Sequence, residues 1–218
     1  MYTKKQTMTQ LKKIVLRIIK LSDLRLAVLV GLSLFLSLSM TTIASAYTTS
    51  TTISSTLSGV ISLFTTDVTV NDNVLPAASG AQTIASDTVT ISTNDSAGYA
   101  LRLGETSASS SLTYNSNTIP ASSGTQAAPI AMADNTWGYR VDGVGGFGAG
   151  PTSPASSTAI SGTITFAAVP ASGSPNTLVT TSGTATNATT TVWYGVAANT
   201  SIPSGTYTNS VTYTATAN

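Results

Sequence analysis

Hydrophobic and polar residues alternate along much of the chain after residue 46, most clearly between residues 87 and 103. In this stretch, DTVTISTNDSAGYALRL, apolar residues alternate with Thr and Ser before and after the turn-forming segment NDSAG. A period of two places successive side chains on opposite faces of a β-strand. Asn, Asp and Gly between two such segments favour a tight turn. The pattern predicts a β-hairpin over residues 87–103.

A second pair of alternating segments closes the sequence. TTTVWYGVAA at 189–198 and TYTNSVTYTATAN at 206–218 flank a Pro-Ser-Gly turn. In the last segment Val, Tyr and Ala fall on one face and Thr on the other, as in a strand with one buried and one solvated face. The pattern predicts a second strand pair. Trp193 and Tyr194 are adjacent, so at least one of them must point inward.

The rest of the chain predicts further short strands separated by Gly-, Pro- and Ser-rich turns. Thr and other β-branched residues are abundant there and favour a pleated backbone. Short strands with turns at this spacing predict a single all-β domain over 47–218, an antiparallel β-sandwich of roughly 8–10 strands of immunoglobulin-like or pilin-like type. A closed barrel is the alternative. The additional strands are expected near residues 59–64, 67–70, 110–114, 136–141, 160–168 and 176–181.

Residues 1–46 have the composition of an export signal. Seven of the nine basic residues precede the uncharged run at 26–46, which ends in Ala-Ser-Ala. A basic head, an apolar middle and small residues before the cut predict cleavage between Ala46 and Tyr47. The uncharged run also has about the 20 residues that a membrane span needs, so an uncleaved anchor helix is the alternative. In both cases we expect the remaining chain outside the cytoplasmic membrane, with membrane contact only through this segment.

The sign of the charge differs between the segment before residue 47 and the rest of the chain. Residues 47–218 hold two bases, Arg102 and Arg140, and seven acids, so two minus seven gives a net charge of −5. Nucleic-acid binding requires a cationic surface that displaces phosphate counterions, and this class of function is excluded. The chain has no cysteine, so its stability must come from a buried core and not from disulfides.

Residues 143–148, GVGGFG, satisfy the glycine pattern G-x-G-x-x-G. In dinucleotide-binding proteins this pattern delivers a phosphate to the N-terminus of the helix that follows. Here the continuation AGPTSPASSTA contains two prolines and no helical period. We therefore interpret the segment as a mobile surface loop, and expect no nucleotide or other cofactor.

The residue types needed for covalent or acid–base catalysis are scarce. The chain has no histidine and no cysteine, and residues 47–218 have no lysine, which excludes nucleophile–base pairs of the usual kinds. Asp134 and Asp142 flank one predicted strand, but eight extended residues separate them by roughly 26 Å. Two carboxylates of a glycosidase lie about 5 to 10 Å apart. We expect a protein without enzymatic activity.

Two binding hypotheses arise from local clusters. Asp67, Asn71, Asp72 and Asn73 offer oxygen ligands that calcium accepts, although their spacing is not that of an EF-hand loop; the alternative is an ordinary turn. Trp137, Tyr139 and Phe147 could form an aromatic platform for sugar rings. The alternative is that these aromatic residues fill the core of the sandwich.

Three segments resemble exported bacterial cell-surface proteins: TNDSAGYAL at 93–101, NTWGY at 135–139 and PSGTYTNSVTYTATAN at 203–218. They are similar to segments of WxL-like wall proteins and of archaic chaperone–usher pilins. The chain lacks the Trp-x-Leu motif and the cysteine pair that many pilins carry. The resemblance implies a structural or adhesive protein of the cell surface, with wall or surface glycans or like subunits as partners.

A pilin-like or S-layer-like subunit would assemble by adding one of its strands to the sheet of a neighbour. The segment YTTSTTISSTLSGVISLF at 47–64 could do so, because strand addition requires backbone hydrogen bonds and few special side chains. The alternative is that it forms the first strand of its own sandwich. A carbohydrate-binding module is a further alternative, which requires Trp137 or Tyr139 to be exposed.

Overall fold

The computed structural model of the chain describes residues 11–14, 16–17, 20, 23, 25–26, 52–67 and 69–218. The chain divides into two units, Met1–Ser55 and Thr56–Asn218. The described residues between 11 and 26 are helical and exposed. Among the described residues, no helix is long and apolar enough to cross a membrane. Residues 27–51 lie outside the described part, and with them the expected cleavage site at Ala46 and Tyr47.

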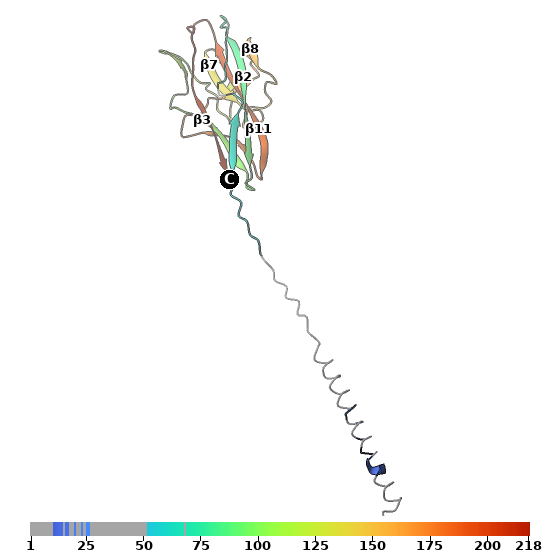
Figure 1. Ribbon diagram of the computed structural model, residues 1–218. Helices are drawn as coiled ribbons and strands as arrows, with labels where there is room; N and C mark the ends of the chain where they lie inside the picture. Colours follow the sequence, from blue (N-terminus) through green and yellow to red (C-terminus); the bar gives the residue numbers. More distant parts are fainter. Residues whose placement is uncertain are drawn as a thin grey trace, which may run out of the picture. The chain divides into compact units, whose positions relative to one another are not determined.

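The second unit is built from antiparallel sheets, which confirms the all-β prediction. The larger sheet has the order β1 (Ile61–Thr65), β2 (Ala81–Thr93), β11 (Ala185–Ala198) and β7 (Thr136–Arg140). A further strand, β8 (Ala155–Thr158), pairs with the first part of β2 on the side that β1 occupies farther along. The long strands β2 and β11 run side by side through the unit (Figure 1).

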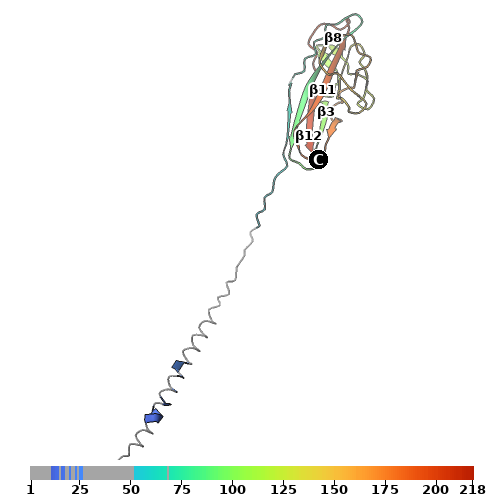
Figure 2. The ribbon, with the colours of Figure 1, turned by 90° about the vertical axis from the view of Figure 1, so that its right-hand side faces the viewer.

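The second sheet has three strands with β3 in the centre. Its order is β10 (Asn176–Thr180), β3 (Tyr99–Glu105) and β12 (Val211–Ala217), and β3 and β12 lie beside each other in Figure 2. Two small antiparallel pairs complete the unit, namely β4 (Leu112–Tyr114) with β5 (Asn117–Ile119), and β6 (Ile130–Ala131) with β9 (Thr165–Phe166).

The two sheets pack against each other through one hydrophobic core. Val89 and Ile91 of β2 and Leu101 and Leu103 of β3 are at most 1% exposed and belong to the same cluster. Each pair alternates along its strand with less buried or polar positions, as the period of two requires. The predicted inward faces of both strands are confirmed.

The predicted pairing of these strands is wrong. β2 and β3 do not form a hairpin but belong to different sheets, and the same holds for β11 and β12. β2 pairs instead with β11, in a register that places Thr90 opposite Thr189, and β3 pairs with β10 and β12. The alternation is the same whether two strands lie side by side or face each other across a core, so the sequence pattern cannot distinguish these cases.

The turn after β2 carries the chain from one sheet to the other. The Asp95 side chain accepts a hydrogen bond of 2.8 Å from the backbone N–H of Ala97, and the Asp95 carbonyl accepts one of 3.2 Å from Gly98. Gly98 has φ +91°, and a Cβ there would lie 2.3 Å from the carbonyl oxygen of Thr181, just after β10. Only glycine fits this close approach between the turn and the second sheet.

Most of the shorter predicted strands occur near their expected positions, as β1, β4, β7 and β10. Two differ: the described residues of 67–70 form no strand, and in 160–168 only Thr165–Phe166 is a strand. The strands β5, β6 and β8 were not predicted from the sequence, and β2 begins at Ala81, six residues earlier than expected. The described residues thus contain twelve strands where 8–10 were predicted, because several short pairs form between loops.

A second hydrophobic cluster covers the outer face of the larger sheet. Ile84, Trp193 and Ala197 from β2 and β11 pack there with Met132 and Phe166 from the segments around β6 and β9. Trp193 therefore points away from the main core while its neighbour Tyr194 points into it, and both are buried. The larger sheet is covered on both faces over this part of its length.

The packing of Phe166 on the outer face of the larger sheet predicts that two Phe→Ala substitutions differ in their effect on stability. Phe166 is fully buried, whereas Phe64 on the edge strand β1 is 66% exposed. We expect Phe166→Ala to lower the free energy of unfolding by about 3–5 kcal/mol, because it leaves a cavity against the sheet. The matched control, Phe64→Ala, should change it by less than about 0.5 kcal/mol. Urea denaturation followed by tryptophan fluorescence measures both, and equal losses would contradict the packing described.

Candidate functional site

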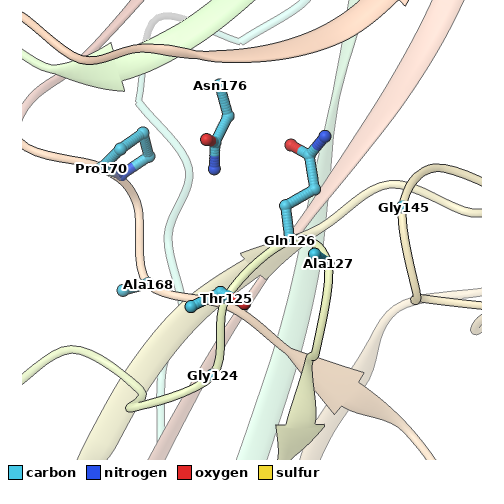
Figure 3. Close-up of a pocket in the computed structure, with 8 residues that line it drawn as sticks. All are labelled: Gly124, Thr125, Gln126, Ala127, Gly145, Ala168, Pro170 and Asn176. Atoms are coloured by element: carbon cyan, nitrogen blue, oxygen red, sulfur yellow. The ribbon is translucent and has the colours of Figure 1, made fainter.

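A surface pocket of about 450 Å³ lies where three loops meet the start of β10 (Figure 3). Its lining is entirely uncharged, and most of it is small. In Figure 3 the amide groups of two larger side chains, Gln126 and Asn176, lie near each other beside Pro170. The lining residues are Gly124, Thr125, Gln126, Ala127, Gly145, Ala168, Pro170 and Asn176.

The loop that carries Gln126 is held by its own backbone. Thr125 and Ala128 exchange two backbone N–H to carbonyl hydrogen bonds of 3.1 Å. The N–H of Gly146 donates to the Gln126 carbonyl over 2.8 Å. Gly145 has φ +57°, and a Cβ there would lie 2.2 Å from the Gln126 carbonyl oxygen, so this wall of the pocket requires glycine.

The two amides share a buried partner beneath the pocket. The hydroxyl of Tyr139 donates to Oε1 of Gln126 over 2.7 Å and accepts a hydrogen bond of 2.8 Å from Nδ2 of Asn176. Nε2 of Gln126 donates to the Thr177 carbonyl over 2.9 Å. Burial raises the pKa of Tyr139 to about 12, and the hydrogen bond from Asn176 opposes the shift. The tyrosine therefore stays neutral and fixes which end of each amide points outward.

The glycine-rich segment 143–148 is a loop with most of its residues exposed, as expected, and it is anchored to the unit through Phe147. Phe147 is 4% exposed, and Gly143 donates its backbone N–H to the Gly148 carbonyl over 2.9 Å. Arg140, itself fully buried, donates to the carbonyls of Phe147 and Gly148 and forms an ion pair with Asp142 at 3.0 Å. The glycines allow close packing of this loop, and no helix follows them.

The aromatic platform proposed from the sequence is not on the surface. Trp137, Tyr139 and Phe147 are between 0% and 4% exposed and belong to the main core, and the rings of Tyr139 and Phe147 meet edge to face at 5.6 Å. A sugar ring cannot stack on a buried face, so these side chains do not contact a glycan in this conformation. They fill the main core together with aliphatic side chains such as Leu101 and Leu103.

The residues proposed as calcium ligands do not converge. Along 70–74 burial alternates, so that Asp72 points inward with Val70 and Val74 while Asn71 and Asn73 are exposed. Within the described part of the chain, Asp and Glu side chains form no group of three or more that could hold a metal ion. The extended backbone therefore separates the oxygen ligands that the sequence places together.

The other acids are mostly held by local partners. Oδ1 of Asp87 accepts hydrogen bonds of 3.1 Å from the Thr66 hydroxyl and from the backbone N–H of Asp67. Asp134 accepts one of 3.3 Å from Asn199, while Asp142 pairs with Arg140. These contacts are those of side chains that stabilise turns and strand ends.

Two carboxylates are exceptions, because they are buried without a complete set of partners. Among the described residues neither carboxylate oxygen of Glu105 has a hydrogen-bond partner, nor does Oδ1 of Asp72, and Glu105 is 3% exposed. Burial raises the pKa of Glu105 to about 7, opposed by the nearby side chain of Asn209, and burial alone raises that of Asp72 to about 7.

A pair of tyrosines lies in the same core. The hydroxyls of Tyr194 and Tyr213 are 2.7 Å apart and join β11 of the larger sheet to β12 of the smaller one. Burial raises the pKa of both tyrosines, and the charges of Asp87 and Glu105 add to the shift of Tyr194. The polar centre of the core is thus built from groups that favour their neutral forms.

Sequence reasoning missed the residues that line the pocket. Gln126 and Asn176 are single amides in Ser-, Ala- and Pro-rich loops, 50 positions apart, and no local spacing links them. Only Tyr139 was selected, for its ring rather than for its hydroxyl. A buried tyrosine needs a hydrogen-bond partner, which is the one signal in the sequence that an amide would lie nearby.

The buried carboxylates predict an unusual dependence of stability on pH. Because the pKa of Glu105 in the folded state exceeds its ordinary value of 4.5, folding favours the protonated form. The stabilisation is complete below about pH 4.5 and is lost as the pH rises toward about 7. We expect Glu105→Gln to raise the free energy of unfolding at pH 8 and to flatten its decline between pH 5 and 8, measured by urea denaturation.

A second variant tests the same cause at another position. Asp72→Asn should change the pH dependence of the free energy of unfolding in the same direction, because burial also raises the pKa of the Asp72 carboxyl. Profiles of both variants that coincide with the wild-type profile would show that the two carboxyls are hydrated in solution.

No family model, curated protein or solved structure matches the chain. A functional assignment therefore rests on the residues, contacts and charges described above.

Proposed function

We propose that this chain is an exported, non-enzymatic surface protein with a structural or adhesive role, built as an antiparallel β-sandwich. The observation that carries the proposal is the chemical character of the surface and of the pocket. On β12 the threonines at 212, 214 and 216 are exposed while Val211, Tyr213 and Ala215 are half-buried. The pocket is lined only by uncharged groups. Such groups can bind neutral partners through hydrogen bonds but cannot transfer protons at neutral pH.

The basic and apolar segment before residue 47 supports export. The second unit has few charged residues, and its solubility therefore does not depend on charge repulsion. We take this composition to fit a protein that works outside the cell.

The proposal is tested by location and mass. In the producing cells, mild protease treatment of intact cells should release fragments of the second unit, and antibodies against it should label the surface. Intact-mass measurement should give the mass of residues 47–218 if cleavage follows Ala46, or that of the full chain if the segment is an anchor. Protein found only in the cytoplasm would contradict the proposal.

A second candidate, assembly by strand addition, is favoured by the segment that leads into β1. Ile53, Leu57 and Val60 are 91%, 80% and 63% exposed, although they are apolar. The segment 61–65 pairs with β2 of its own chain, whereas 52–60 forms no strand. An uncharged, extended segment with exposed apolar side chains next to an edge strand is suited to pair with another sheet edge.

Backbone groups of Ser58 and Val60 join this segment to the end of β2. The carbonyl of Val60 accepts hydrogen bonds from the Thr93 hydroxyl and the Asn94 N–H. The Asn94 side chain accepts a hydrogen bond of 2.6 Å from the N–H of Val60 and donates one of 3.0 Å to the carbonyl of Ser58. Leu57, directly before these residues, is 80% exposed. The exposed residues therefore contribute little to the stability of their own fold.

Deletion of residues 47–58 separates assembly from folding. We expect the thermal midpoint to change by less than about 4 °C, because β1 and its ladder remain. If the segment drives assembly, filaments seen by electron microscopy should disappear. The double variant Ile53→Ser and Leu57→Ser keeps the chain length and should have the same effect. Filaments that persist in both variants would contradict strand addition by this segment. A large decrease in the thermal midpoint would show that the segment is part of the fold of its own chain.

A further inference from the structure

The pocket beside Gln126 and Asn176 has the features of a prearranged hydrogen-bonding site. The order of contacts runs from Asn176 to the hydroxyl of Tyr139, from that hydroxyl to Gln126, and from Gln126 to the Thr177 carbonyl. Each group donates to the next, so reversal of either amide would break a contact with a buried partner. A site whose polar groups are already oriented loses less entropy when a ligand binds.

The chain of contacts leaves specific atoms for a ligand. Each amide NH₂ has two N–H groups and uses one of them in the hydrogen bonds described above. In the described part of the chain, Oδ1 of Asn176 has no hydrogen-bond partner, whereas Nδ2 donates to Tyr139. The pocket therefore presents one amide oxygen as an acceptor, with amide N–H groups close by as donors. Neighbouring hydroxyls of a sugar, which both donate and accept, match this arrangement.

The walls of the pocket suit the apolar part of the same ligand. Ala127, Ala168 and Pro170 provide small apolar surfaces, and Gly124 and Gly145 allow the loops of the wall to pack closely on neighbouring backbone. A Cβ at Gly124 would lie 2.4 Å from the carbonyl oxygen of Phe166, so a side chain cannot be added there without displacing the loop. The volume of about 450 Å³ lies within the range of small-ligand sites and accommodates a sugar ring.

The absence of charge from the lining decides between classes of sugar. Among the described residues no arginine lines the pocket. Arg140 is fully buried and paired with Asp142. The exposed Arg102, opposite Thr177 in the ladder, is not part of the lining. A phosphorylated or carboxylated ligand would lose its hydration in the pocket without a cation to replace it. An uncharged ligand loses much less.

We propose that this pocket binds one unit of an uncharged saccharide, with Asn176 and Gln126 as contact residues and Tyr139 as the positioning residue beneath them. The inference rests on the proposed adhesive function and gives it a ligand class. It also assigns to Tyr139 a role that differs from stacking: its ring is core, and its hydroxyl holds the two amides.

The test is an NMR titration of the full-length protein, kept in a detergent whose head group is not a sugar. The probes are the trimer of N-acetylglucosamine and the trimer of glucose. Saturable shifts of the Asn176 and Gln126 side-chain amide signals with at least one probe are expected, with a dissociation constant on the order of 1 mM, as is usual for a single shallow site. No saturable shift with either probe would overturn the proposal.

Three variants locate the binding. Asn176→Leu should weaken it at least tenfold, and Gln126→Leu gives a second measurement if the first variant folds poorly. Asn71→Leu, at an exposed asparagine outside the pocket, is the matched control and should bind as the wild type does. Binding that survives both pocket variants would place the sugar elsewhere and overturn the proposal. Surface labelling and intact mass are independent of this result, so failure of the pocket leaves the proposed export and display untouched.

Discussion

The fold depends on the ladder between β2 and β11, two long strands separated by about a hundred residues of chain. The ladder extends from Ala81 opposite Ala198 to Thr93 opposite Ala185, with a single irregularity near its end. Forming it closes a long loop, which costs entropy before any contact repays it. Burial of side chains on both faces of the two strands offsets this entropy cost. Tyr194 lies in the main core, and Trp193 lies in the cluster on the outer face. β1, β7 and β8 are attached to these two strands and have no other partners in the larger sheet.

Some polar groups inside the fold have hydrogen-bond partners for their side chains, and others do not. Arg140 is fully buried, and three carbonyls and a carboxylate surround it, so its charge holds the glycine-rich loop in place. Glu105 is also buried, but it has no cation and no hydrogen-bond partner for its oxygens among the described residues. A buried carboxyl of this kind is tolerated in its neutral form. The interior is therefore better suited to mildly acidic than to alkaline surroundings, a property of the core and not of the surface.

The proposed function follows from where the uncharged polar groups lie. Threonine hydroxyls cover the exposed side of β12, and amides line the pocket, so that both surfaces offer uncharged hydrogen-bond donors and acceptors. Hydrogen bonding without charge gives weak contacts that depend little on salt, and a surface protein gains strength from repeating them. The exposed apolar residues of 52–60 offer a way to bring several copies together. The proposed assembly and the proposed saccharide binding are thus compatible with the proposed adhesive role.

The sequence by itself determined the class of fold, the faces of the main strands and the low content of charged residues in the second unit. Val89, Ile91, Leu101 and Leu103 point inward as their spacing requires, because the side-chain period of a strand is a local property. The tertiary structure alone decided which strands pair, since the same alternation serves a hairpin and two strands facing across a core. It alone brought Gln126, Tyr139 and Asn176 together, because they come from separate loops and strands whose approach depends on the packing of the whole unit. Local pattern fixes the direction of a side chain, but its neighbours are set by contacts between residues far apart in the chain.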